Sequence, residues 1–329
     1  MQALVPPVSV SPQRVGFKQQ VLQQIQDTLH VLRPFFDDEQ VNEIMVNAPN
    51  EVFISRAGQE LRIPVRLAAG EISAAITLVA TMLSKEVGDR SGHRILSGRL
   101  PGFRIEAILP PVAVNGPSMC IRRHASQLFT LDQCIASGVV SQRHALLVEQ
   151  AVAAHETFLI VGGTGSGKTT LMNAVLARMD ARERLFIIES VQELQVLADN
   201  QVLIECDEEQ GVTARRAVRT AMRYAPRRII VGELRGAEAY DWLDAANTGH
   251  PGSAATIHAN GASAALSRLE NLLLMADMGV PFEALRLRIA DTVRWMFYIE
   301  RSGNTRRLSE VSRLHGYDRA RGEYQIERL

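Results

Sequence analysis

Residues 157–170 read TFLIVGGTGSGKTT, an apolar run followed by a glycine-rich segment. The glycine-rich part matches the pattern G-x-x-x-x-G-K-[ST] at Gly162–Thr169, and a helical pattern follows it directly. Glycines allow backbone N–H groups to turn toward an anion, and the amino end of a helix adds positive potential at the same place. The stretch therefore predicts a phosphate-binding loop between a buried strand and a helix.

The chemistry of this loop explains its residue types. The Lys168 ammonium suits the β- and γ-phosphates of a nucleotide, and the Thr169 hydroxyl suits Mg2+. The chain has only three lysines, and the other 33 basic residues are arginine, so a lysine at this position indicates a specific requirement. The residues expected to bind the nucleotide are Gly162, Gly163, Thr164, Gly165, Ser166, Gly167, Lys168, Thr169 and Thr170.

Around the loop, short apolar runs alternate with helical patterns from residue 141 onward. Ser141 is expected to cap the first helix of this region. The alternation favours an α/β fold with a mainly parallel sheet and helices on both faces. We therefore predict that residues 141–329 form a P-loop NTPase domain.

The preceding residues follow a different pattern. Residues 17–36 have the spacing of an amphipathic helix that ends near Pro34, and residues 41–66 alternate apolar runs with turn signals. A helix at about 71–85 and further strands complete a smaller α+β domain over residues 1–125. Residues 126–140 carry no long period and are predicted to be a linker.

Composition narrows the class of protein. The chain has 329 residues, 46% hydrophobic and 22% charged, which suits two globular domains and excludes disordered or collagen-like chains. Lysine plus arginine and aspartate plus glutamate both number 36, so no overall charge draws the chain to nucleic acid. Three widely spaced cysteines indicate reduced thiols, and no apolar window is long enough to span a membrane. We expect a cytoplasmic protein.

A phosphate loop also needs acidic partners. Glu233 and Glu189 each follow an apolar run, which is where a general base or a carboxylate on the metal side is expected. Glu193 lies four residues after Glu189 and could instead cap a turn. The alternative for each of the three is a solvated surface glutamate.

Two histidines, His250 and His258, flank a run of small residues at 248–260. A metal site is one interpretation, but no cysteine or third acidic ligand lies nearby in the sequence. A neutral histidine that senses the γ-phosphate through a hydrogen bond fits a nucleotide site better.

Several ordered motifs are similar to those of the secretion ATPases of the type II and type IV secretion superfamily. They are GGTGSGKTT, IIESVQEL, RRIIVGELRG and TGHPGSAATIHAN, with GFRIEAILPP and MCIRR upstream. The chain most resembles the conjugal-transfer, Trb-type, members over residues 90–320. The resemblance implies a RecA-like ATPase domain.

The resemblance also implies residue roles. Glu233 would orient the attacking water, Glu189 would act on the Mg2+ side through water, and His258 would contact the γ-phosphate. Arginines from the first domain and from the second Walker motif are expected on the phosphates, although each could be a solvated surface arginine: Arg104, Arg122, Arg123 and Arg235. Members of the family form hexameric rings that bind ATP and Mg2+.

Two positions depart from the family pattern. The family commonly has Glu-Asp where this chain has Glu189-Ser190, and it commonly has Pro-Asp where this chain has Pro226-Arg227. The missing second acid predicts lower turnover, and the second departure predicts an altered surface contact.

The sequence therefore predicts a homohexameric, Mg2+-dependent ATPase that works with inner-membrane components of a type IV secretion or conjugation machine. A pilus or type II secretion ATPase, and a nucleotide-switched assembly module with little hydrolysis, are the alternatives. Direct DNA binding is disfavoured, because the net charge is zero and no basic stretch contains interleaved aromatic residues.

Overall fold

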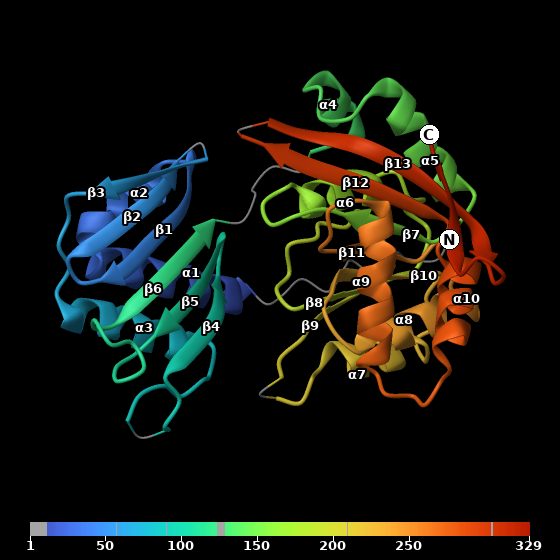
Figure 1. The fold of residues 1–329 in the computed structure, drawn as a ribbon. Coiled ribbons are helices and arrows are strands. Elements are labelled where there is room, and N and C mark those ends of the chain that lie inside the picture. The colour runs from blue at the N-terminus through green and yellow to red at the C-terminus, as the bar shows by residue number, and fades with distance from the viewer. Residues whose placement is uncertain (1–11, 57, 90, 124–128, 209, 304) are drawn as a thin grey trace, which may run out of the picture. The chain divides into compact units, whose positions relative to one another are not determined.

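The computed structural model describes residues 12–56, 58–89, 91–123, 129–208, 210–303 and 305–329. The chain divides into two compact units, Met1–Ser126 and Gln127–Leu329, each with a sheet and a buried core of its own (Figure 1).

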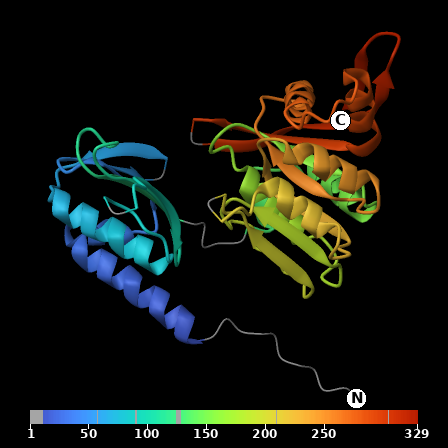
Figure 2. The ribbon, with the colours of Figure 1, turned by 90° about the horizontal axis from the view of Figure 1, so that it is seen from below.

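The first unit is built around an antiparallel sheet in the strand order β3-β2-β1-β6-β5-β4. Helices α1 and α3 lie side by side and cover one face of this sheet (Figures 1 and 2). This arrangement confirms the predicted α+β fold. Its elements are α1 (Pro12–Thr28), the 3-10 helix η1 (His30–Leu32), α2 (Arg33–Asp37), β1 (Val41–Ala48), β2 (Glu51–Arg56), β3 (Gln59–Ile63), α3 (Ala69–Met82), β4 (Ile95–Leu100), β5 (Phe103–Ile108) and β6 (Ser118–Arg123).

The predicted single helix over 17–36 is wrong at its end. Helix α1 ends at Thr28, and Pro34 lies in the first turn of the separate helix α2. A proline is tolerated there because the first N–H groups of a helix have no partner within the helix. The apolar spacing continues across the break because Leu29, Leu32 and Phe36 are buried in the same core as α1.

The second unit has a mainly parallel sheet in the order β14-β13-β12-β7-β11-β10-β8-β9, which confirms the predicted α/β class. Strands β13 and β14 extend it in an antiparallel manner. Its elements are α4 (Leu131–Ala136), α5 (Gln142–Ala153), β7 (Phe158–Val161), α6 (Lys168–Leu176), β8 (Leu185–Glu189), β9 (Gln201–Glu205), α7 (Ala214–Ala221), β10 (Arg228–Leu234), α8 (Glu238–Asn247), β11 (Ala254–Ile257), α9 (Ala262–Leu274), α10 (Phe282–Thr292), β12 (Trp295–Ser302), β13 (Thr305–Asp318) and β14 (Glu323–Arg328).

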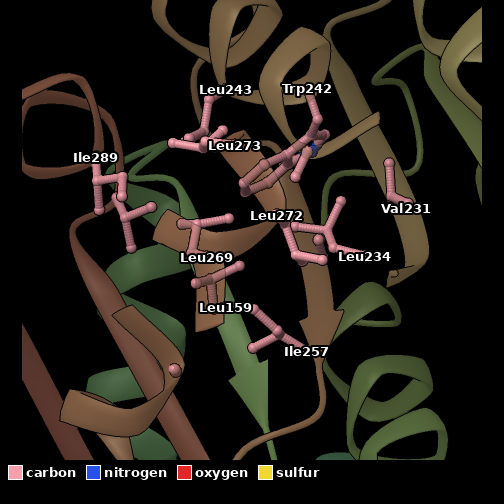
Figure 3. Packing of buried hydrophobic residues seen from close by; sticks show 14 of the residues in the cluster. Leu159, Val231, Leu234, Trp242, Leu243, Ile257, Leu269, Leu272, Leu273 and Ile289 are labelled. Atoms are coloured by element: carbon pink, nitrogen blue, oxygen red, sulfur yellow. The ribbon is translucent and has the colours of Figure 1, made fainter. Parts of the chain in front are cut away.

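Helices cover both faces of this sheet, and its central strand β7 is apolar and buried at every position. Leu159 and Val161 of β7 face α7, α8, α9 and α10, and Figure 3 shows Leu159 in the same cluster as the buried Trp242. Phe158 and Ile160 face α4, α5 and α6 on the other side. Alternate side chains of a strand point to opposite faces, so an all-apolar strand must be buried on both.

The segment predicted as a linker, 126–140, contains a helix. The Thr130 hydroxyl accepts a hydrogen bond from the Gln133 N–H and begins α4, whose Leu131 and Cys134 are buried in the core of the second unit. A helix of six residues is too short to show a helical period, which explains why the sequence predicted a linker here. Ser141 caps α5 as predicted, because its hydroxyl accepts from the His144 N–H.

Two further predictions concern the cysteines and the possibility of a membrane-spanning helix. Cys120, Cys134 and Cys206 are free thiols, and burial raises the pKa of each. Within the described ranges, the helices are all too short or too polar to cross a bilayer.

A buried ion pair fixes the amino edge of the parallel sheet. Arg228, at the start of β10, is 1% exposed and binds both carboxylate oxygens of Glu183, at 2.5 and 3.0 Å. The same guanidinium donates to the carbonyl oxygens of Val152 and Gly252. One side chain thus joins the end of α5, the start of β10 and the turn before β11.

Arg228→Met should lower the free energy of unfolding of the second unit by about 3 kcal/mol, because the largely buried Glu183 carboxylate would lose its main partner and keep only His155 at 3.7 Å. Both tryptophans, Trp242 and Trp295, lie in this unit, so urea titration followed by tryptophan fluorescence reports its unfolding. The exposed neighbour Arg227 is the control, and Arg227→Met should change the value by about 0.5 kcal/mol or less. Equal losses in both variants would contradict a structural role of the pair.

Candidate functional site: a phosphate loop and its acidic partners

The phosphate loop connects β7 to α6 and can form only with glycine at several positions. Gly165 and Gly167 have φ of 68° and 99°, a region that favours glycine. A Cβ atom on Gly162 would lie 2.5 Å from the Ile299 carbonyl oxygen and 2.5 Å from the Ser166 hydroxyl, whereas the space next to Gly163 is open. The loop therefore packs closely against Ile299 at Gly162 and leaves open space next to Gly163.

Two polar groups of the loop suit an anion. The Ser166 hydroxyl is buried and makes no hydrogen bond to any described residue. Lys168 begins α6, and its Nζ donates to the Gly163 carbonyl oxygen at 2.9 Å. Burial lowers the pKa of this ammonium; the charge of Glu233 opposes the shift and that of Arg235 reinforces it. A bound polyphosphate would stabilise the charged form of Lys168 and offer acceptors to the loop.

The two acids at and after the end of β8 accept hydrogen bonds from different groups. Glu189 is 6% exposed, and its Oε1 accepts hydrogen bonds from the backbone N–H groups of Glu193 and Leu194, both at 3.0 Å. Glu193 is the acid that reaches the loop helix, since its Oε2 accepts from the Thr169 hydroxyl at 3.2 Å. Glu189 therefore holds the turn, and its action on Mg2+ through water stays a prediction. Glu193 lies beside the hydroxyl expected to bind Mg2+.

Asn173, which the motifs did not indicate, holds the same turn from α6. Its side-chain amide donates to the Glu193 carbonyl oxygen, and its side-chain oxygen accepts from the Gln195 N–H at 2.8 Å. Asparagine has one donor and one acceptor group, so it can bind both sides of an irregular segment. Asn173 is buried among apolar residues of α6, and the local sequence pattern does not indicate this role.

Glu233 lies near the end of β10 and is held by its neighbours in the chain. Its Oε2 accepts from Nε and Nη2 of Arg235 at 2.9 and 2.5 Å. The Glu238 carboxylate, at the start of α8, accepts from the Arg235 and Gly236 N–H groups and so fixes the turn. Because both Glu233 and Arg235 influence the pKa of Lys168, the end of β10 and the phosphate loop belong to one electrostatic site.

Glycine is also required within β10. A Cβ atom on Gly232 would lie 2.8 Å from Cγ of Glu189, so the Glu189 side chain packs directly on the backbone next to Glu233. The Thr256 hydroxyl of β11 donates to the Gly232 carbonyl oxygen from the other side. The ends of β8, β10 and β11 are thereby joined at one edge of the sheet.

The two predicted histidines lie at opposite edges of the sheet. His258 follows β11, whose last residue pairs with Val161 beside the loop, and its side chain is exposed. His250 precedes β11, and its Nδ1 lies 2.9 Å from the Pro226 carbonyl oxygen ahead of β10. Parallel strands place their amino ends away from their carboxyl ends, so within this unit His250 lies at the other end of β11 from the phosphate loop, and its role as a secondary site residue stays a prediction.

The predicted arginines of the first unit have partners within that unit. Arg104 pairs with Glu106 at 2.7 Å, and Arg122 lies 3.5 Å from Glu43. Arg123 donates to the carbonyl oxygens of Val41, Phe36 and Asp38 and lies over the Phe103 ring. Its guanidinium thus has a structural role at the end of α2, which makes Arg123 the weakest of the three candidates for the nucleotide.

Two side chains at the loop have oxygens that suit a metal ion. Among the described residues, no cluster of three or more histidine, cysteine or acidic side chains could bind a metal ion. Mg2+ commonly takes one or two protein oxygens and completes its shell with phosphates and water. Thr169 and Glu193 fit that pattern, so they are the residues that would hold Mg2+ beside a nucleotide.

The fold and this loop define a RecA-like P-loop domain preceded by an α+β domain. The family described as "Type II/IV secretion system protein" matches residues 26–296, and the chain belongs to that family. The resemblance predicted from the motifs is thereby confirmed. The match begins within α1, well before residue 90, so it includes much of the first unit.

Relatives and a solved structure agree with this assignment. The conjugal transfer protein TrbB of Rhizobium radiobacter is 38% identical over 313 residues, which cover 93% of this chain and 94% of that protein. The type IV secretion system protein VirB11 of Brucella suis biovar 1 is 32% identical over 321 residues, covering 86% and 88%. The ATPase DotB of Legionella pneumophila shares the fold, with a TM-score of 0.61 at 21% identity over 93% of this chain and 82% of that one.

Glu189→Ala should lower the free energy of unfolding of the second unit by about 1–3 kcal/mol, because two backbone N–H groups would lose their acceptor. Glu193→Ala should cost about 0.5 kcal/mol or less, since only one partly exposed hydrogen bond is lost. Urea titration followed by tryptophan fluorescence measures both. A larger loss for Glu193→Ala would contradict the division of roles.

Proposed function

We propose that this protein hydrolyses ATP in a Mg2+-dependent reaction that energises a type IV secretion or conjugal transfer system. The observation that carries the proposal is the meeting of Lys168, the Thr169–Glu193 contact and Glu233 around a glycine loop at one edge of the sheet. The near full-length similarity to a conjugal transfer protein supports the biological setting.

Each residue has a chemical task in this proposal. The loop N–H groups and Lys168 hold the phosphates and neutralise the charge that develops during transfer. Glu233 orients the attacking water and accepts its proton, while Arg235 keeps the Glu233 carboxylate in place. Mg2+, when bound, supplies further neutralisation of phosphate charge. His258 lies at the edge where it could hydrogen-bond the γ-phosphate.

The family match supports a proposal for the assembly and its partners. A homohexamer is proposed, peripheral to the inner membrane on its cytoplasmic side and bound to membrane components of the machine. Arg104 and Arg122 remain proposed phosphate contacts from the first unit. A direct role in DNA binding is not part of the proposal, because the chain carries no net charge.

A second candidate is an assembly module that binds nucleotide and hydrolyses little of it. Glu233 is neutralised by Arg235 at 2.5 Å, and Ser190 replaces the second acid of the family pattern. Both features would slow turnover without preventing binding. A pilus or type II secretion ATPase is less well supported, since the relatives with the highest identity named above act in conjugal transfer and type IV secretion.

Lys168→Ala should reduce ATP hydrolysis about 100-fold or more, because the only ammonium at the phosphates is removed. The fold should persist, since the side chain makes a single hydrogen bond, to Gly163. A phosphate-release assay measures turnover, and circular dichroism with a melting curve checks folding. Normal hydrolysis by a folded Lys168→Ala variant would overturn the assignment of the loop.

Glu233→Gln should retain nucleotide binding and lose hydrolysis, because the amide cannot accept the proton of the attacking water. Hydrolysis is measured beside light scattering, with and without ATP and Mg2+. Wild-type turnover from a particle of about six subunits, lost in the variant, supports the ring ATPase. Assembly with nucleotide but without turnover in either protein favours the assembly module instead.

A further inference from the structure

The hairpin formed by β12 and β13 lies against the phosphate loop. Strand β12 pairs in parallel with β7, and the last pair is Tyr298 with Val161, so residues 299–302 continue past the point where the loop begins. Figure 1 shows this hairpin in red, next to β7 and α6. The close approach of the Ile299 carbonyl oxygen to Gly162 shows that hairpin and loop are in direct contact.

Two arginines near the end of this hairpin reach the loop. Arg301 and Arg306 are partners across the two strands. Arg306 donates from Nε to the Gly165 carbonyl oxygen at 3.2 Å, and a Cβ atom on Gly165 would lie 3.4 Å from Nη1 of Arg301. A Cβ atom on Gly167 would lie 3.2 Å from Cδ of Arg306. Arg306 therefore contacts the segment expected to surround the phosphates, and Arg301 lies next to it.

The charges of these two arginines are not balanced by acids. Within the described part of the chain, neither guanidinium has a carboxylate within 4.0 Å, and Arg301 donates from Nε only to the carbonyl oxygen of Gly303 in its own turn. Like charges directly opposite one another destabilise a strand pair. An anion at the loop would remove that repulsion and use the guanidinium donors that the loop carbonyl does not take.

The position of the hairpin decides which part of a nucleotide it can reach. Strand β12 lies on one side of β7, whereas β11, β10 and β8, with Glu233 and Glu193 at their ends, lie on the other. The acids mark the side of the Mg2+ ion and the attacked γ-phosphate. The arginines therefore face the part of the phosphate chain that ADP and ATP share.

We propose that Arg306 and Arg301 are nucleotide-binding residues that hold the α- and β-phosphates from the β12–β13 hairpin. The inference rests on the proposed nucleotide site and adds to it a second cationic group, on the flank opposite the acids. These residues position the nucleotide and take no part in the attack of water.

The test is the dissociation constant of ADP and of a non-hydrolysable ATP analogue, measured by isothermal titration calorimetry for Arg306→Ala, Arg301→Ala and the double variant. Loss of one charge-assisted hydrogen bond should weaken ADP and the analogue by the same factor, about tenfold for each single variant. The kcat at saturating ATP should stay within about twofold of wild type while KM rises with the dissociation constant. Arg306→Gln replaces Arg306→Ala if the latter does not fold.

Arg307→Ala is the matched control. Arg307 is the next residue of the same strand, its register partner is Glu300, and its side chain points to the opposite face from that of Arg306. Its removal should leave both dissociation constants unchanged. Unchanged ADP binding in the Arg306 and Arg301 variants, or a fall in kcat with unchanged binding, overturns this inference alone. Failure of the wild-type protein to bind either nucleotide overturns the proposed function, and this inference with it.

Discussion

The site depends on one constraint: β7 is hydrogen-bonded between β11 and β12 and runs parallel to both. Parallel neighbours end at the same edge, so the segments that follow them meet at the loop after Val161. Strand β11 brings His258 to this edge, and β10, one strand further, brings Glu233. Strand β12 places the β12–β13 hairpin, with Arg301 and Arg306, at the same edge. The close approach is possible because Gly162 has no Cβ atom that would collide with the Ile299 carbonyl oxygen.

The sequence was sufficient at the phosphate loop and at the start of α5, where the determinants are adjacent in the chain. An apolar strand, a glycine loop and a lysine at the start of a helix form one continuous pattern, and so do Ser141 and the helix that it caps. It was not sufficient to separate the roles of Glu189 and Glu193. Glu189 ends β8 and Glu193 lies four residues later. Their roles depend on which of the two carboxylates accepts hydrogen bonds from the backbone N–H groups of residues 193 and 194. That turn is set by packing on Gly232 and by Asn173, neither of which a local pattern shows.

Site residues that lie far apart in the chain, or on either side of a strand, were harder to predict from the sequence. Arg306 lies 141 residues from Gly165, and nothing in its local sequence distinguishes it from the other arginines. Arg123, by contrast, occupies a motif and uses its donors on carbonyl groups at the end of α2. His250 and His258 look equivalent in one short segment. The four residues of β11 place them at opposite edges, so one lies near the loop and the other near Pro226.

In this site the acidic side chains already accept hydrogen bonds, whereas the cationic side chains still have donors for an anion. Glu233 has Arg235, and Glu193 has the Thr169 hydroxyl, so the acids are already bound by donors. Lys168 is partly desolvated, which lowers its pKa, and Arg301 and Arg306 face one another across the hairpin. A polyphosphate at the loop would relieve both of these costs at once. Because such a ligand binds only the folded loop and hairpin, binding would also stabilise the C-terminal strands against the core of the domain. Nucleotide binding at the proposed site would therefore stabilise β12 and β13 through their contacts with the backbone of the phosphate loop.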